Sequence, residues 1–301
     1  MPKGDPFVTS IEAAVAFVQR GDRLAIAGSR LMKKPMALVR ELIRQGTGDL
    51  EMMTNNASIE ADMLIGAGQL RQITFTNCVL DIAGMAPNFR KKVESGDVRA
   101  LEFGTMAMMR SLEVTERDIP VGLVRSLMGS DLVKHHPGQH RMVGGELLLE
   151  VPAYQPDVTF LHAPYADVDG NVLLTHETFD FMFAKAAKKC VVTVEKILPF
   201  REFRTRGYGG LGVAELKARD IDALLVAPWG AYPTSCFPLY AQDNRYILEY
   251  VDANAARGID AYLDENVRGH TEIEFLERVG LRRLFELQHM MDIGRAAVSR
   301  G

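Results

Sequence analysis

The stretch GDRLAIAGSRLMKKPMALVRELIRQ, residues 21–45, decides the fold. The apolar run 24–27 predicts a short strand, and Gly28 and Ser29 predict the turn that ends it. Pro35 then opens a helix, because proline is favoured at a first helical position, whose N–H has no intrahelical partner. The pattern predicts a strand, a basic loop and a helix in direct succession.

Three basic side chains stand beside this helix start. Arg30, Lys33 and Lys34 lie in the loop, next to free backbone amides and the positive end of the helix dipole. Such a site suits a carboxylate or a phosphate. The alternative is that the three cations form only a solvated face, and their spacing by itself names no reaction.

Composition is that of an ordinary globular protein: 301 residues, 47% hydrophobic and 25% charged, enough to bury a full core. The formal net charge of −4 gives no global basic field, which argues against nucleic acid or an anionic membrane as a partner. The three cysteines, Cys78, Cys190 and Cys236, lack metal-ligand spacing, so we expect reduced thiols, no metal and a cytoplasmic protein. No signal region opens the chain, and no run approaches the ~18 apolar residues of a membrane span.

Strand and helix signals alternate along the rest of the chain. The predicted strands are 50–54, 72–76, 98–103, 119–124, 147–151, 158–162, 172–174, 191–194 and 221–227. This alternation predicts an α/β fold with an open, mainly parallel sheet flanked by helices, in a single domain over residues 1–301. From Tyr246 onward the pattern predicts a helical C-terminal tail.

Two segments are irregular. The segment from Gly129 to Gly145 contains three histidines, but no metal-ligand set is completed locally, so we interpret it as a surface excursion. The segment from Pro199 to Arg219 is interpreted as a basic loop. Its glycines at 207, 209 and 212 fit the letters of a dinucleotide fingerprint, yet no apolar strand precedes them, so we expect no nicotinamide or flavin site.

Polar and small residues follow several of the predicted strands. In an open α/β sheet, ligands bind at the carboxyl ends of the strands. Amide donors and small residues there suit a thioester carbonyl or a carboxylate, although each residue singly could be a cap, a turn or a satisfied core group. The candidate substrate-binding residues are Gly28, Ser29, Arg30, Lys34, Asn55, Asn56, Asn77, Gly104, Thr105, Met128, Gly129 and His162.

Glu195 ends the buried run 191–194 and is the one candidate catalytic residue. A poorly solvated carboxylate there could act as a nucleophile or base. The alternative is a structural salt bridge or a helix-cap partner. His162, at the end of its own strand, has the same two interpretations. The common hydrolase, metalloprotease and NTPase motifs are absent from the sequence.

Seven stretches in register resemble the alpha (A) subunits of family I CoA-transferases, the glutaconate type among them. They span roughly residues 10–285 and read Gly21-Asp22 with LAIAGS and KKPMALVRELIRQG, ADMLIGAGQLR, NFRKKVESGDV, GGELLLEVPAYQPDVTFLHAPYADVDGNV, AAKKCVVTVEKI, IDALLVAPWGAYPTSCFPLYAQDN and FLERVGLRRL.

The resemblance implies a CoA-transferase/NagB-like fold, a coenzyme A thioester as substrate with no permanently bound cofactor, and a beta (B) subunit as partner in a heterotetramer or larger assembly. In that family the nucleophilic glutamate belongs to the beta subunit, in a Ser-x-Glu-Asn-Gly setting. This chain has no Glu-Asn-Gly, since its Glu265-Asn266 is followed by Val267. It therefore resembles a half-enzyme that closes the acyl pocket and holds the acid, with Lys34 expected to bind the acid's carboxylate.

The resemblance leaves the substrate and the reaction open. The loop AGSRLMKKP has one glycine where many members have a Gly-Gly-Phe start and a further glycine, so the acid could be a dicarboxylate or, if Thr105 and Met106 face it, an apolar acid. Related hydrolases that open a cyclic diketone CoA thioester in steroid-ring breakdown resemble the same alpha-type chain. Non-catalytic metabolite sensors share the general fold, but this chain lacks their DNA-binding extension.

Overall fold

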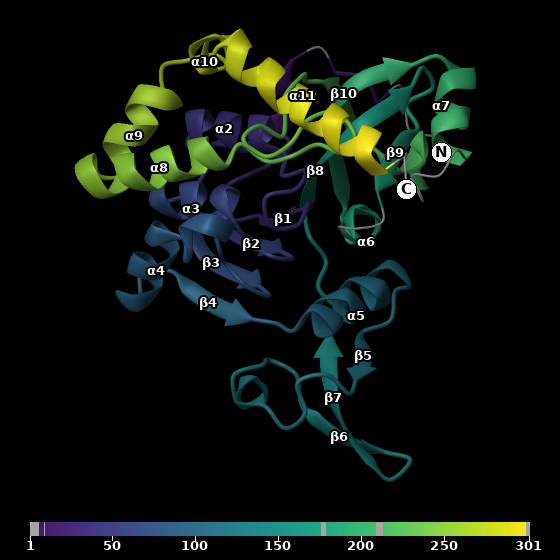
Figure 1. The fold of residues 1–301 in the computed structure, drawn as a ribbon. Helices are drawn as coiled ribbons and strands as arrows, with labels where there is room; N and C mark the ends of the chain where they lie inside the picture. Colours follow the sequence, from purple (N-terminus) through teal and green to yellow (C-terminus); the bar gives the residue numbers. More distant parts are fainter. Residues whose placement is uncertain (1–5, 9, 176–178, 209–212, 299–301) are drawn as a thin grey trace.

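The computed structural model describes residues 6–8, 10–175, 179–208 and 213–298, and its centre is a nine-stranded sheet (Figure 1). Strands β12, β10, β8, β1, β2, β3 and β4 lie side by side in that order and run parallel, while β9 and β11 extend the sheet antiparallel. The predicted open, mainly parallel sheet is confirmed. The strands are β1 (Arg23–Ile26), β2 (Leu50–Thr54), β3 (Leu70–Phe75), β4 (Arg99–Glu102), β8 (Val158–Asp167), β9 (Val172–Thr175), β10 (Lys189–Leu198), β11 (Val213–Leu216) and β12 (Ala223–Val226).

Helices cover both faces of this sheet. One apolar cluster joins alternate strand residues to α1 (Ile11–Val15), α2 (Met36–Gln45), α3 (Ile59–Gly66), α4 (Pro87–Glu94), α8 (Asn244–Arg257) and α9 (Ile259–Asn266). A second cluster joins the other strand residues to α5 (Thr105–Glu116) and α6 (Asp180–Ala186). In β1, Leu24 and Ile26 belong to the first cluster and Ala25 to the second, and all three are fully buried. Burial of both faces explains why the strand reads as a continuous apolar run.

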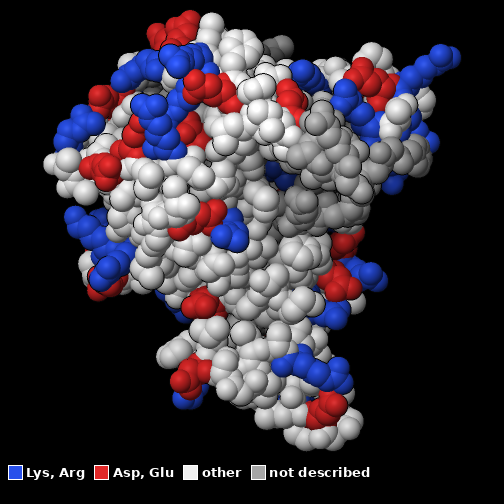
Figure 2. Space-filling view, viewed as in Figure 1, with Lys and Arg blue, Asp and Glu red and all other residues white. Residues whose placement is uncertain are grey.

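The predicted helical tail is also confirmed. After α8 and α9 the chain forms α10 (Glu272–Val279) and α11 (Leu281–Val298), which Figure 1 shows lying across the top of the sheet in yellow. In the view of Figure 2, Lys and Arg are mixed with Asp and Glu over these C-terminal helices, so this face carries no extended patch of one sign. No helix in the described parts of the chain is both long and apolar enough to cross a bilayer.

A small unit projects from the carboxyl edge of the main sheet (Figure 1). It consists of α5 and an antiparallel sheet of β5 (Val121–Val124), β7 (Glu146–Pro152) and β6 (His140–Val143). The predicted excursion 129–145 therefore contains a 3-10 turn, Asp131–Lys134, and one paired strand, although it does lie at the surface.

The prediction of a loop over 199–219 is wrong within the described residues. The chain forms α7 (Phe200–Tyr208) there, and then β11. The helix is amphipathic: Phe203 is buried against Tyr165, while Glu202 and Arg206 form an exposed i, i+4 pair. The arginine-rich sequence did not indicate a helix, because the apolar side of this helix has only one buried residue in two turns. Gly209 and Gly212 of the rejected fingerprint lie outside the described residues.

Gly28 makes the tight turn after β1, and no larger residue fits. Its φ is +82°, and an added Cβ would lie 2.7 Å from the Met32 carbonyl oxygen and 2.8 Å from that of Lys33. Gly21 has a similar φ of +86° but nothing within 4 Å of an added Cβ. Both glycines therefore have a positive φ that disfavours other residues, but only at Gly28 would an added Cβ clash with backbone atoms.

We predict that Gly21→Ala lowers the free energy of unfolding by about 1–2 kcal/mol, the usual penalty of a left-handed non-glycine residue. Gly28→Ala should lower it by at least about 2 kcal/mol more, because backbone atoms must move. Urea unfolding of both variants measures the difference, and equal losses would contradict the steric argument.

Candidate functional site

The carboxyl edge of the sheet carries a row of hydrogen-bonded polar residues, which we call the polar strip: the buried Ser29, the partly exposed Asn56 and the exposed Asn77. The Asn56 side-chain amide donates to Ser29 Oγ at 2.8 Å, and the Asn77 amide donates to Asn56 Oδ1 at 2.6 Å. These three residues follow β1, β2 and β3, so the predicted meeting of strand ends occurs. Each of the two amides keeps a further N–H beyond these bonds.

The other candidates near the polar strip have different surroundings. Arg30 is exposed and pairs with Asp81 at 2.7 Å, and its backbone N–H donates to the Asn56 carbonyl. Asn55 is buried beneath the strip, where its side-chain oxygen accepts from the Thr76 hydroxyl at 3.0 Å. Arg30 therefore lies at the open edge, whereas Asn55 lies beneath the polar strip and supports the strip.

Lys34 does not face the open edge. Its ammonium is fully buried and pairs with the equally buried Glu60 at 2.7 Å, and it also donates to Thr54 Oγ1 at 2.9 Å. Glu60 accepts further hydrogen bonds from the amide and hydroxyl of Ser58. This corrects the interpretation of Lys34 as a group that binds the carboxylate of the acid, because Glu60 already neutralises its charge inside the chain. The pattern of strands and helices in the sequence could not predict this pairing.

Lys33 and Gly28 converge on a second buried carboxylate, Asp180, at the start of α6. The Lys33 ammonium lies 2.8 Å from one oxygen of Asp180, and the Gly28 N–H donates to the other at 2.8 Å. The Gly28 amide is therefore occupied and cannot serve as an oxyanion donor in this conformation. Sequence reasoning missed Asp180 because 152 residues separate it from Gly28.

The start of α2 is also covered. The Ala37 N–H donates to the Gly230 carbonyl at 2.8 Å, and the Lys34 N–H donates to Thr234 Oγ1 at 3.1 Å. The expected free amides are thus used by the segment 228–240, which we call the roof segment. The helix start is a packing site in this chain, and the predicted open anion site does not form there.

His162 and Glu195, considered separately from sequence, meet in the structure. Both lie inside strands, because β8 and β10 stay paired through Asp167 and Leu198, so neither is at a strand end as predicted. His162 Nε2 lies 2.9 Å from Glu195 Oε1, and its Nδ1 lies 2.9 Å from Thr193 Oγ1. Both side chains are buried.

Glu195 joins this pair to the roof segment. Its Oε2 accepts from the Trp229 backbone N–H at 2.7 Å, and its Oε1 accepts from the Tyr240 hydroxyl at 2.5 Å. The Trp229 and Tyr240 rings stack with centroids 4.2 Å apart. Burial and the charge of Glu195 raise the pKa of Tyr240 well above its usual value, so the phenol stays a donor. Glu195 therefore anchors the roof segment, which agrees with the structural alternative and not with a catalytic role.

Cys236 lies beside this pair, and its sulfur, the His162 ring and a Glu195 oxygen all lie within 4.8 Å of one another. These are donor types that zinc accepts. A metal ion would have to displace the His162–Glu195 and Tyr240–Glu195 hydrogen bonds. Burial, followed by the charge of Glu195, raises the pKa of the Cys236 thiol well above its usual value, which disfavours the thiolate that a metal requires.

The remaining candidates lie at the base of the projecting unit. Gly104 packs against Leu127, since an added Cβ would lie 2.7 Å from its side chain. Gly104, Thr105 and Met128 are partly exposed and Gly129 is exposed. The structure places these residues at the carboxyl end of β4, but no hydrogen bond joins them to the polar strip in the described part of the chain.

An apolar cleft opens beside the polar strip, and sequence reasoning missed it. Its volume is about 500 Å³ and it shares Asn77 with the strip. The edge-to-face pair Phe75 and Phe89, with centroids 5.1 Å apart, contributes to its wall. Glu102 lies at its rim and is exposed, and its carboxylate has no hydrogen-bond or ion-pair partner among the described residues. The whole lining is Phe75, Asn77, Cys78, Val79, Met85, Phe89, Val93, Ala100, Leu101, Glu102, Leu132 and His135.

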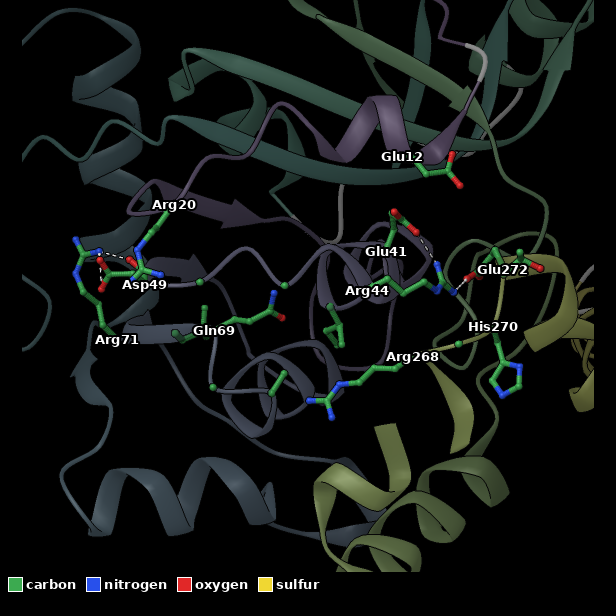
Figure 3. A pocket seen from close by; sticks show the side chains of 18 of the residues that line it. Glu12, Arg20, Glu41, Arg44, Asp49, Gln69, Arg71, Arg268, His270 and Glu272 are labelled. Atoms are coloured by element: carbon green, nitrogen blue, oxygen red, sulfur yellow. Dashed lines mark hydrogen bonds and ion pairs between the residues drawn. The ribbon is translucent and has the colours of Figure 1, made fainter. Parts of the chain in front are cut away.

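A larger cavity of about 890 Å³ lies at the opposite, amino-terminal edge of the strands (Figure 3). Its lining contains four arginines and six carboxylates, many of which neutralise each other. Arg44, for example, bridges Glu41 and Glu272. We place the candidate active site at the carboxyl edge despite the smaller volume there, because open parallel sheets bind ligands at that edge.

The sequence and the fold have known relatives. A family model described as Coenzyme A transferase matches residues 8–206. The A subunit of glutaconate CoA-transferase from Acidaminococcus fermentans is 28% identical over 95% of this chain and 96% of its own length. The crystal structure of glutaconate coenzyme A-transferase from that organism matches with a TM-score of 0.86 and 27% identity, covering 94% of this chain and 95% of that one.

Two further relatives carry different names. The A subunit of 3-oxoadipate CoA-transferase from Pseudomonas knackmussii is 32% identical over 87% of this chain and 93% of its own. The IpdA subunit of a cholesterol ring-cleaving hydrolase from Mycobacterium tuberculosis is 28% identical over 81% of this chain and 87% of its own.

We predict that Lys34→Ala destabilises the fold by about 3–5 kcal/mol, because it leaves Glu60 buried without a counter-charge. Replacing both partners, Lys34→Met with Glu60→Gln, should recover most of that loss in urea unfolding. The exposed pair Arg90–Glu94 supplies the control, and Arg90→Ala should change stability by less than ~1 kcal/mol. If Lys34→Ala alone caused only a small loss of stability, the buried pair would be contradicted and the interpretation of Lys34 as part of a solvated face would be favoured.

Trp229 is the only tryptophan of the chain, so its fluorescence reports on the anchored roof segment. We predict that Glu195→Gln shifts Trp229 emission to longer wavelength and lowers stability by about 1–3 kcal/mol, since an amide cannot accept all three hydrogen bonds. Glu202→Gln, in an exposed pair, is the control and should leave emission unchanged. Identical spectra for both variants would show that Glu195 does not hold this segment.

Proposed function

The chain belongs to the Coenzyme A transferase family, and from this we propose that it is the A subunit of a heteromeric CoA-transferase, which moves CoA from an acyl-CoA thioester to a carboxylic acid. The resemblance predicted from sequence is confirmed by the family model and by the relatives named as A subunits. Relatives named as A subunits imply a B subunit as partner.

The state of Glu195 is the observation that carries the proposal. A nucleophilic carboxylate needs a free oxygen that a thioester carbonyl can reach. Glu195 is 7% exposed and accepts from His162, Tyr240 and Trp229. The candidate that the sequence offered is therefore unsuited to attack, and we assign the reactive glutamate to the B subunit.

This chain would then supply one wall of the reaction site. With the Gly28 amide bound to Asp180, the donors at the open edge include the second N–H groups of Asn56 and Asn77. Donors fixed in this way can stabilise negative charge on a thioester oxygen, at about 2.7–4 kcal/mol for each well-placed group. Closure by the partner would exclude water and align the two reactants.

The assembly and the compartment are further parts of the proposal. We place the enzyme in the cytoplasm because Cys78, Cys190 and Cys236 are free and buried, as in a reducing compartment. We propose a heterotetramer or larger assembly of alpha and beta subunits. CoA enters as the thioester of the donor acid and leaves as the thioester of the acceptor acid.

A hydrolase is the second candidate, and Glu102 favours it. Its carboxylate lies at the rim of an apolar cleft with no partner among the described residues, where it could activate water. A similar chain is named as a subunit of a cholesterol ring-cleaving hydrolase, which supports this candidate. Acceptor dependence separates the two reactions.

We predict that the complex with its B subunit, incubated with acyl-CoA, forms a CoA thioester on a glutamate of that partner. Borohydride or hydroxylamine treatment followed by peptide mass spectrometry locates the modification. Addition of an acceptor acid should then discharge this thioester and yield the CoA thioester of that acid, without net release of free CoA. A label on Glu195 would refute the division of labour. CoA release without acceptor, lowered about 10²–10⁴-fold by Glu102→Gln, would instead establish the hydrolase.

A further inference from the structure

The apolar cleft at the carboxyl edge differs in chemistry from the rest of that edge. Nine of its twelve lining residues are apolar, and the polar ones are Asn77, Glu102 and His135. Its volume of about 500 Å³ lies within the range of small-ligand sites, ~300–1,000 Å³. The cleft is walled by α4, by the ends of β3 and β4, and by the turn at Leu132 of the projecting unit.

No lysine or arginine lines this cleft in the described chain, and its only charged side chain is the carboxylate of Glu102. The basic residues of the neighbouring loop are committed elsewhere. Lys33 pairs with Asp180, Lys34 with Glu60 and Arg30 with Asp81. An anionic group that entered the cleft would therefore lose water without gaining a counter-charge.

The cleft is continuous with the polar strip through Asn77, which lines the cleft and also donates to Asn56. A thioester or carboxyl group at the strip would thus point the remainder of its acyl chain into apolar surroundings. The strip supplies the polar end of the site and the cleft supplies the apolar end.

We propose that this cleft binds the acyl chain of the substrate, and that the acid is a monocarboxylic acid with an apolar body. This inference rests on the proposed function and deepens it. It also separates this chain from the relatives named for glutaconate and 3-oxoadipate, which are dicarboxylates. A distal carboxylate would meet Glu102 and no cation, which is the more costly arrangement.

The first test compares hexanoate with adipate, which have equal length and differ by the distal carboxylate. With the complex of both subunits and acetyl-CoA as donor, kcat/KM for hexanoate should exceed that for adipate by at least about tenfold, since the buried terminal methyl group gains roughly fourfold and the distal carboxylate would lose water without gaining a counter-charge. Met85→Lys adds a cation at an exposed position of the cleft and should lower this ratio at least tenfold. Lys92→Ala, on α4 outside the cleft, is the matched control and should leave the ratio unchanged.

Equal or better use of adipate by the unmodified complex would overturn the inference, and so would a ratio that Met85→Lys does not change.

If neither acid is accepted and CoA is simply released, the transferase proposal fails, and a binding measurement alone then tests the cleft. Saturation-transfer NMR with hexanoyl and adipoyl thioesters of N-acetylcysteamine measures this without turnover. If the protein contacts the hexanoyl methyl group and Val93→Arg abolishes this contact, the acyl cleft is supported. Equal contact between the protein and the adipoyl chain refutes it.

Discussion

Two buried ion pairs on consecutive residues hold the loop between β1 and α2, and the rest of the carboxyl edge depends on that loop. Lys33 pairs with Asp180 of α6, and Lys34 pairs with Glu60 of α3. These helices lie on opposite faces of the sheet, so the adjacent lysines bind the loop to both layers. A buried charge without its partner is strongly destabilising, so each pair fixes one arrangement of the loop even where its net contribution to stability is small.

The roof segment is the second constraint on the same loop. It accepts hydrogen bonds from the Ala37 amide of α2 and the Lys34 amide before the helix. Arg40 of α2 donates to the Tyr232 carbonyl and pairs with Glu272 of α10. Glu195 holds the segment from below through Trp229 and Tyr240. The C-terminal helices pack on this segment through Phe275 and Leu284. The tail thus supports the site from a distance.

A consequence of these constraints is that most charged groups near the candidate site are already neutralised. What stays open at the edge, among the described residues, is the amides of Asn56 and Asn77, the paired Arg30, the carboxylate of Glu102 and an apolar cleft. Such a surface can orient and polarise a thioester, yet within the described parts of the chain we find no well-placed nucleophile on it. The chemistry therefore fits a subunit that is completed by a partner.

The sequence by itself determined the alternation of strands and helices, the mainly parallel sheet, the helical tail and the family, because apolar periodicity and local motifs depend on neighbours within a few residues. It also indicated that Ser29, Asn56 and Asn77 would share one edge, since parallel strands end together. It could not reveal the buried partners of Lys34 and Gly28, nor that His162 and Glu195 meet, because those partners lie on other elements and only packing selects them. Pairings such as Gly28 with Asp180, 152 residues apart, leave no periodic signal in the sequence. Tertiary structure alone decided which charges are neutralised inside the core and which side chains remain available to a ligand.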